Sequence, residues 1–161
     1  MSNAAPELSL EGIVQFAIRI EEESKTFYEE AHKRQLSLDE AEQDAEVIAL
    51  LAKLIQDEVS HRDRLMKRYE ILPEKTGLID DANLKEAVER IVHAPDLPEA
   101  SDAAGVLQVA HRREIATRDL YNTLLSLSQL SDLYELFDEL AKQEQGHANR
   151  IRSLLKRLEA I

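Results

Sequence analysis

Two segments of the chain place a glutamate three residues before a histidine and agree in their surroundings. The pairs are Glu58-x-x-His61 and Glu144-x-x-His147, separated by a constant offset of 86 residues. Residues three apart on an α-helix lie on the same face, so each pair can hold one cation between a carboxylate and an imidazole. The spacing therefore predicts metal binding at two related positions.

Two further glutamates, Glu21 and Glu114, stand 93 residues apart in a repeated context. The repeated segments read Ala17-x-x-x-Glu21-x-x-Ser24-x-x-Phe27-Tyr28 and Ala110-x-x-x-Glu114-x-x-Thr117-x-x-Leu120-Tyr121. Each half of a duplicated chain thus supplies one single glutamate and one Glu-x-x-His pair. Two single glutamates and two Glu-x-x-His pairs form the dinuclear carboxylate site of ferritin-like and designed four-helix bundles. The candidate metal ligands are therefore Glu21, Glu58, His61, Glu114, Glu144 and His147.

The sequence also predicts how far along the bundle axis each of these residues lies. Residues at one level of an antiparallel hairpin are numbered symmetrically about its loop. Glu21 and Glu58 average 39.5, and Glu114 and Glu144 average 129. Both midpoints fall in or beside polar segments that are expected to be connections. All four carboxylates and both imidazoles are therefore expected at the middle of the bundle.

The other histidines are not expected to bind this metal. Glu29-x-x-His32 repeats the spacing, but His32 follows Glu21 by eleven residues, which is about 16 Å along a helix. His111 stands beside two arginines and is expected at the surface, and His93 is expected to be structural in a connecting segment.

The ligand types indicate which metals would fit. Four glutamates in a bundle core repel one another when no cation is bound, which raises the pKa values of their carboxyl groups. Two divalent cations would change the formal net charge from −12 to −8. Carboxylate and imidazole ligands without thiolate suit iron or manganese, with zinc as an alternative. The donor set by itself leaves the choice among these metals open.

Apolar residues at helical spacing predict the elements that must position these ligands. Long helices are expected over about 9–34, over 102–128 and over 132–159, with a short one over 83–93. A further long helix carries apolar residues from Val47 to Met66 and ends near 70. Ser9 and Asp102 are suitable helix N-caps. Residues 129–131 are expected to form a turn. The whole chain, 1–161, is expected to be one domain with hairpins over 9–70 and 103–159.

The connection lengths predict the topology. Short loops make each hairpin antiparallel. The crossover over 71–102 contains Pro73, Gly77, Pro95 and Pro98. It is long enough to cross the bundle, because extended chain covers about 3.3 Å per residue against 1.5 Å in a helix. The predicted fold is all-α, a ferritin-like four-helix bundle rather than a simple up-down-up-down bundle.

The motifs that begin at Glu21 and Glu114, together with the two Glu-x-x-His pairs, resemble the erythrin domain of rubrerythrin-type proteins in the ferritin-like di-iron superfamily. The resemblance covers about residues 9–159. It implies a non-haem di-iron centre that reduces hydrogen peroxide or oxygen, with the six candidates as iron ligands. It also implies a homodimer, the common assembly in the family.

The chain departs from full rubrerythrins at two points. It has no Cys, so it lacks their rubredoxin-like domain, and its electrons must come from a redox partner protein. Rubrerythrins also carry an additional glutamate one turn after the third-helix ligand, where this chain has Thr117. The resulting site is more symmetric and closer to that of bacterioferritin.

Several neighbouring residues allow two interpretations. Tyr28 and Tyr121 either donate hydrogen bonds to ligand carboxylates or are amphipathic core residues. Ser24 and Thr117 are interpreted as small residues that leave room for metals and oxidant. Gly146 lies inside a helix at a cost of about 1 kcal/mol relative to Ala, and it would open a path for oxygen, permit a π-bulge or allow a close helix contact.

The composition excludes other functions. With 32 acidic and 20 basic residues among 161, the chain should repel nucleic acid and anionic membranes. The N-terminus lacks a signal sequence, and no apolar run is long enough to span a bilayer. A cytoplasmic location is expected. Residues 2–4 resemble a tag remnant.

The leading hypothesis is a di-iron protein that reduces peroxide or oxygen. A ferroxidase or iron-handling protein is the first alternative. A non-enzymatic helical module with a structural metal is the second, and an oxygenase acting on an organic substrate ranks last because the chain is short.

Overall fold

The computed structural model describes residues 5–72, 77–94, 96–97, 102–127 and 133–159. The described part of the chain forms five α-helices and no strand beyond an isolated bridge between Ser9 and Leu78. The helices are α1 (Leu10–Leu36), α2 (Ala45–Glu70), α3 (Ala82–Val92), α4 (Ala103–Leu125) and α5 (Tyr134–Glu159). The expectation of an all-α fold is confirmed.

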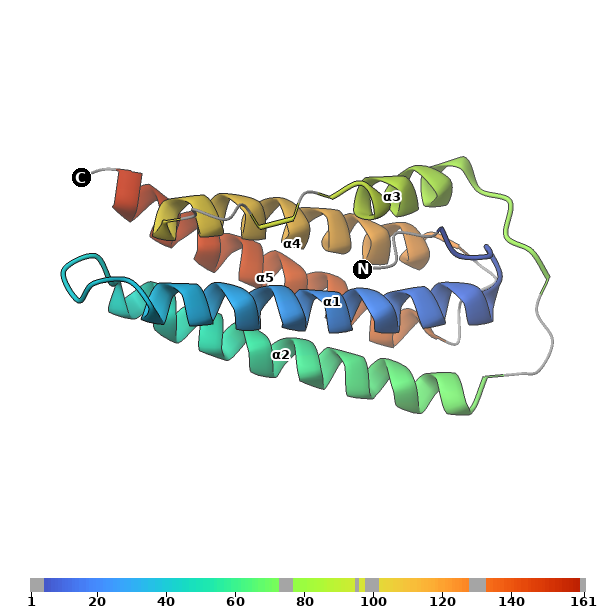
Figure 1. Cartoon of the computed structure of the whole chain (residues 1–161). Coiled ribbons are helices and arrows are strands. Elements are labelled where there is room, and N and C mark those ends of the chain that lie inside the picture. Colours follow the sequence, from blue (N-terminus) through green and yellow to red (C-terminus); the bar gives the residue numbers. More distant parts are fainter. Residues whose placement is uncertain (1–4, 73–76, 95, 98–101, 128–132, 160–161) are drawn as a thin grey trace.

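The four long helices form a bundle of two antiparallel pairs (Figure 1). Helices α1 and α2 pack along their length, as do α4 and α5, and α3 packs against α4. Helix α3 lies between α2 and α4 in the chain, and α4 runs in the same direction as α2 (Figure 1). This is the ferritin-like packing expected from the connection lengths.

The observed helix boundaries differ from the expected ones by a few residues. Helix α1 continues to Leu36, because the amide of Gln43 caps carbonyl groups beyond the expected end. Helix α4 ends at Leu125 rather than at 128, because the hydroxyl of Ser126 binds the carbonyl oxygen of Thr123 at 2.7 Å. Helix α3 starts one residue early, after the N-cap Asp81.

Other boundary expectations have mixed outcomes. Ser9 and Asp102 act as N-caps of α1 and α4, as expected. Helix α5 is described from Tyr134, and its expected start at 132 lies outside the described residues. The expected turn at 129–131, the prolines at 73, 95 and 98, and residues 2–4 lie outside the described residues.

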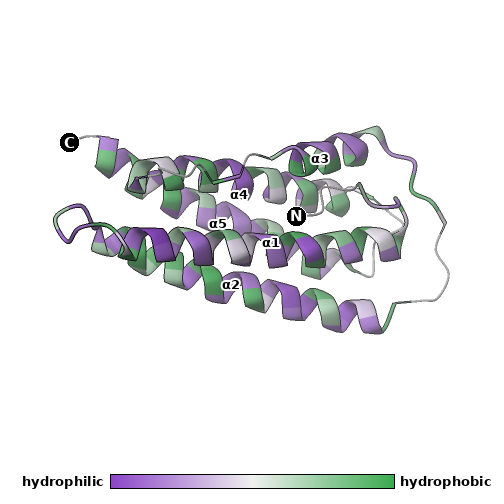
Figure 2. Cartoon of the chain, viewed as in Figure 1, coloured by the Kyte–Doolittle hydropathy of each residue, from purple (hydrophilic) through white to green (hydrophobic). Residues whose placement is uncertain are grey.

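The hydrophobic core is divided into two parts by a polar layer. One part includes Phe16, Leu65, Leu124 and Phe137, and the other includes Phe27, Leu51, Leu54, Leu107 and Ile151. Hydrophilic and hydrophobic residues alternate around each helix (Figure 2), as they do when one stripe of a helix faces a core. The buried apolar ends hold the helices in register on both sides of the polar layer.

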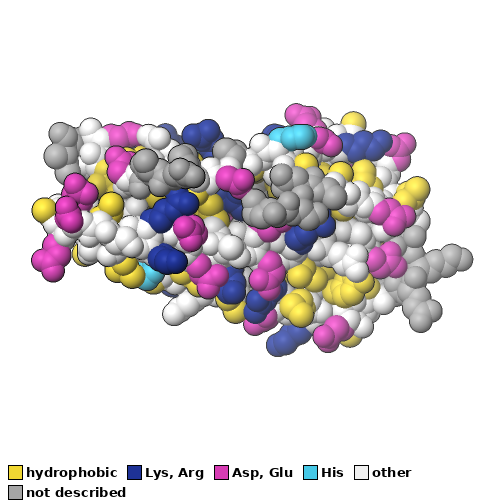
Figure 3. Space-filling view, viewed as in Figure 1, with side chains coloured by type: hydrophobic (Ala, Val, Ile, Leu, Met, Phe, Trp, Pro, Cys, Tyr) yellow, Lys and Arg dark blue, Asp and Glu magenta, His cyan; other side chains and the backbone are white. Residues whose placement is uncertain are grey.

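The surface in Figure 3 carries acidic and basic side chains side by side, with apolar residues between them. Among the described residues, none of the helices is both apolar and long enough to cross a bilayer.

Two glycines should respond oppositely to substitution by alanine. A Cβ at Gly146 would meet no atom within 4 Å, whereas one at Gly12 would lie 2.1 Å from the carbonyl oxygen of Glu7. G146A should therefore raise the free energy of unfolding by about 1 kcal/mol. G12A should lower it by about 1–3 kcal/mol, because the backbone must move. Urea denaturation measures both changes, and equal effects of the two variants would contradict this account.

Candidate metal centre

The polar layer consists of six acidic and imidazole side chains contributed by the four long helices. Helices α1 and α4 each supply one glutamate, and α2 and α5 each supply a Glu-x-x-His pair one helical turn in length. Their exposed fractions are Glu21 0%, Glu58 1%, His61 1%, Glu114 2%, Glu144 1% and His147 3%. The structure thus brings together all six residues identified from the spacing, at the boundary between the two apolar halves.

These side chains form two groups that could each hold a metal ion. The first contains Glu21, Glu58, His61 and Glu144, and the second contains Glu58, Glu114, Glu144 and His147. Within each group, one ligand atom per residue lies within 4.8 Å of all the others. Glu58 and Glu144 belong to both groups, which is the arrangement of carboxylates placed between two neighbouring metal ions.

Both histidines direct Nδ1 into the layer. The Nδ1 atom of His61 lies 3.0 Å from Glu144 Oε1 and 3.4 Å from Glu21 Oε2. The Nδ1 atom of His147 lies 3.5 Å from Glu114 Oε2 and 3.6 Å from Glu58 Oε1. The two rings are nearly parallel, with centroids 5.7 Å apart. The two halves of the chain therefore present the same donor set.

Each of the six residues keeps one buried polar atom without a hydrogen-bond partner. The atoms are Glu21 Oε2, Glu58 Oε1, His61 Nδ1, Glu114 Oε2, Glu144 Oε1 and His147 Nδ1. A buried polar atom without a partner costs about 1–3 kcal/mol, and six in one layer would be a heavy cost for a purely structural core. Carboxylate oxygen and imidazole nitrogen are also a suitable donor set for iron, manganese or zinc. The residues therefore fit a pair of metal ions.

The outer edges of the histidine rings are held by residues that the sequence analysis did not identify. The Nε2–H group of His147 donates to Asp57 Oδ2 at 2.9 Å, and that of His61 donates to Gln143 Oε1. Such bonds fix the tautomer in which Nδ1 carries the lone pair for a metal. Asp57 and Gln143 each precede the glutamate of a Glu-x-x-His pair at the same offset of 86, and that repeated position was the available signal.

The two tyrosines donate hydrogen bonds across the halves of the chain. Tyr121 donates to Glu21 Oε1 at 2.6 Å, and Tyr28 donates to Glu114 Oε1. Helices α1 and α4 run antiparallel (Figure 1), and each tyrosine contacts the glutamate of the other helix. Each glutamate therefore has one oxygen held by a hydroxyl and the other free for a metal.

The tyrosine hydroxyls should matter for metal affinity as well as for packing. Y121F removes the donor to Glu21 but keeps the ring, and Y28F does the same for Glu114. Each should weaken metal binding by about tenfold or more, as loss of a group that orients a ligand commonly does. Competition with a chelator measures the affinity. Y69F is the control, because Tyr69 bonds Gln15 away from the layer, and an equal loss in that variant would contradict the assignment.

The pKa values of the four carboxyl groups divide into two pairs. Burial and repulsion by neighbouring carboxylates raise the pKa values of Glu58 and Glu144 well above the ordinary value. Burial also acts on Glu21 and Glu114, but the effects of the neighbouring carboxyl groups, the adjacent imidazoles and the tyrosine hydroxyls outweigh it and lower their pKa values. The expectation that all four rise is therefore wrong for Glu21 and Glu114.

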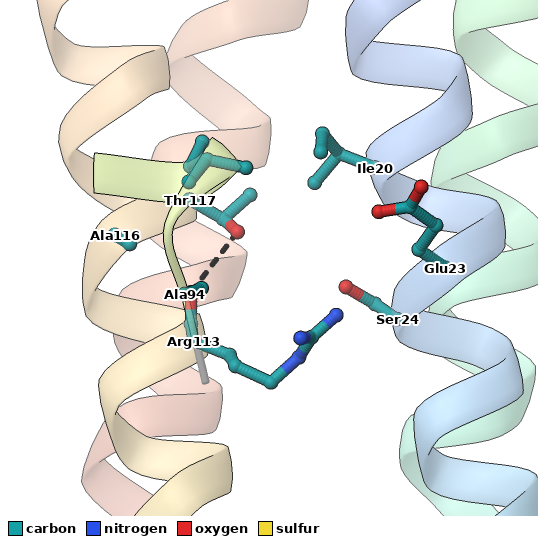
Figure 4. Close-up of a pocket in the computed structure, with 8 residues that line it drawn as sticks. Ile20, Glu23, Ser24, Ala94, Arg113, Ala116 and Thr117 are labelled. Atoms are coloured by element: carbon teal, nitrogen blue, oxygen red, sulfur yellow. Dashed lines mark hydrogen bonds between the residues drawn. The ribbon is translucent and has the colours of Figure 1, made fainter. Parts of the chain in front are cut away.

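A small cavity lies between α1 and α4 (Figure 4), lined by residues close in sequence to Glu21 and Glu114 but by none of the six residues of the layer. Its volume is about 20 Å³, enough for one water-sized molecule. Ser24 and Thr117 line it, and the hydroxyl of Thr117 donates to the carbonyl oxygen of Arg113 at 3.0 Å. Because that hydroxyl is engaged within its own helix, the interpretation of Thr117 as a small residue that leaves space is favoured.

An open cleft of about 430 Å³ lies on the opposite side, between α2 and α5. Its lining includes Asp57, His61, Gln143, Gly146 and His147. Helix α5 passes Gly146 without a π-bulge, and no atom lies close to its missing Cβ. The glycine therefore widens the cleft beside the histidines, and the interpretation as a close helix contact is wrong.

The other histidines lie outside both groups. His93 is exposed and pairs with Glu89 at 3.0 Å, and His32 is part of neither group. His111 is half-buried, and burial together with Arg152 and Arg118 lowers its pKa.

A family model described as a ferritin-like domain matches residues 11–157. The chain therefore belongs to the ferritin-like domain family. The matched range includes every residue of the polar layer. Searches of curated proteins and of solved structures gave no significant match.

Proposed function

We propose that this protein holds two iron ions in the polar layer and transfers electrons from them to hydrogen peroxide or oxygen. The observation that carries the proposal is the set of six buried, unpartnered donor atoms in two groups that share Glu58 and Glu144. Manganese and zinc are alternatives for the same donor set.

The roles of the residues follow from their positions. His61 with Glu21 would hold one ion, and His147 with Glu114 would hold the other. Glu58 and Glu144 lie in both groups and would contribute a carboxylate to either position. Asp57 and Gln143 orient the imidazoles, and the tyrosine hydroxyls orient the terminal carboxylates.

Two ferrous ions, when bound, supply one electron each, which with two protons reduces peroxide to two water molecules or oxygen to peroxide. The open cleft between α2 and α5, whose lining includes His61 and His147, would admit an oxidant of this size.

Stopped-flow oxidation of the ferrous-loaded protein tests the proposal. Mixing with peroxide or oxygen should oxidise the bound iron faster than free ferrous iron at the same concentration. If E144A loses this acceleration and E29A keeps it, the faster oxidation depends on the polar layer. A wild-type rate no greater than that of free iron would overturn the redox function.

A ferroxidase or iron-handling role is the second candidate. The presence of Thr117 favours this role, because rubrerythrins, which the chain resembles, have an additional glutamate at that position. The two functions differ in the fate of the iron. A peroxidase keeps about two ions per chain and returns to the ferrous state when reduced, whereas an iron-handling protein oxidises further additions of ferrous iron and releases the product.

The proposed reaction also needs partners. Because the chain has no Cys, it cannot bind a thiolate iron–sulfur cluster, and we propose that a separate redox protein supplies the electrons. We also propose a homodimer, and sedimentation equilibrium distinguishes it from a monomer and from a large iron-storage assembly.

A further inference from the structure

The residues that hold the outer edges of the two histidines differ in charge. Asp57 and Gln143 occupy equivalent positions in the repeat, each directly before a shared glutamate. One is an acid and the other an amide. The rest of the layer repeats without such a difference, since the six candidate ligands are pairwise identical in type.

The geometry of the two contacts is otherwise alike. Each imidazole donates from Nε2 to an oxygen of the other half, and each directs Nδ1 into the layer. The second oxygen of Asp57 accepts an ion pair from Lys53 at 2.8 Å. Lys53 therefore anchors the carboxylate in place beside His147.

A charged acceptor changes the imidazole as a ligand. A carboxylate that accepts the Nε2 proton raises the electron density and basicity at Nδ1, where the metal binds. A neutral amide fixes the same orientation with a weaker effect. Loss of such an outer partner commonly costs about 10–100-fold in metal affinity.

We propose that the two metal positions are inequivalent, and that the position of Glu114 and His147 binds a divalent cation more tightly and fills first. Asp57 is the positioning residue that makes it the tighter one. This inference rests on the proposed dimetal function and adds an order of filling to it.

Single-position variants test the inference without interference between two bound ions. E21A leaves the group of Glu114 and His147 whole, and E114A leaves the group of Glu21 and His61 whole. Metal-free samples of both are titrated with cobalt(II), whose absorption reports its ligands. E21A should bind its remaining ion about tenfold more tightly than E114A, the low end of the effect of losing an outer partner, because Gln143 still orients His61.

Two conservative substitutions assign any difference to the charge of the outer partner. D57N added to E21A keeps an acceptor but removes the charge, and it should weaken cobalt(II) binding by about tenfold. Q143E added to E114A should strengthen binding. Circular dichroism checks that all variants keep their helices.

The possible outcomes separate this inference from the proposed function. Equal affinities in E21A and E114A, or no change on adding D57N, would overturn the inequivalence while leaving the dimetal site intact. If the wild-type protein binds no cobalt(II), the dimetal function itself is overturned, and the order of filling with it.

Discussion

Replacing Glu58 with alanine should abolish binding of both metal ions, whereas replacing Glu21 should remove only one. Glu58 lies in both groups of donor atoms, and Glu21 lies in one. Without Glu58, each position keeps three donors and the two cations lose a carboxylate that shields their mutual repulsion. Without Glu21, the group of Glu114 and His147 stays complete.

Metal content per chain measures this difference. After anaerobic ferrous loading of protein purified without a metal-affinity step, the wild type should carry about two ions per chain. E21A should then carry about one metal ion per chain, and E58A should carry almost none.

The chain contains its own matched control for this experiment. Glu29-x-x-His32 has the same spacing as the two proposed pairs, but Glu29 is exposed and neither residue belongs to a donor group. E29A and H32A should keep the wild-type content. An unchanged content in E58A, or a reduced one in E29A, would show that the metal binds elsewhere.

Removing the metals should lower the melting temperature, and more strongly at higher pH. A ligand at 100 times its Kd stabilises the folded state by about 2.7 kcal/mol per site. Two ions would then add about 5 kcal/mol, which for a domain of this size corresponds to about 10–20 °C.

The pH dependence follows from the raised pKa values of Glu58 and Glu144. Above their ordinary value of 4.5, the metal-free folded state holds protons that the unfolded chain has lost. Its free energy of unfolding therefore falls as the pH rises. Burial lowers the pKa of His147, but the stronger effects of Glu114 and Asp57 leave it raised above its ordinary value of 6.5. Above pH 6.5 this raised pKa also makes the free energy of unfolding fall as the pH rises. The lowered pKa values of Glu21 and Glu114 contribute stability that is already complete above 4.5.

Calorimetry of metal-free and metal-loaded protein at pH 5.5 and pH 8 measures both effects. The gap between the two melting temperatures should widen at pH 8, because the metal-free form weakens and cations displace protons more easily there. A gap that stays constant or narrows would mean that Glu58 and Glu144 do not hold these protons. E29A again serves as the control, because it removes a charge outside the layer.

The sequence by itself was sufficient for the helices and their topology. Apolar residues at helical spacing predicted four long helices and one short one, and the length of the crossover predicted the ferritin-like packing. The repeated spacing around Glu21 and Glu114 also identified which carboxylates face inward. These features are local or periodic along the chain, so the amino-acid sequence alone contains them. Boundaries such as the end of α4 at Leu125 depend on a single hydroxyl contact and were displaced by a few residues.

Only the tertiary structure decided how the two halves are joined at the polar layer. It placed Glu58 and Glu144 in both donor groups, and it directed each tyrosine to the glutamate of the other half. It also paired His147 with Asp57 and His61 with Gln143. These contacts cross between hairpins that are distant in sequence, and helical periodicity contains no information about which side chain meets which across the interface. Their geometry depends on the relative positions of four packed helices, which are set by the apolar packing on both sides of the layer.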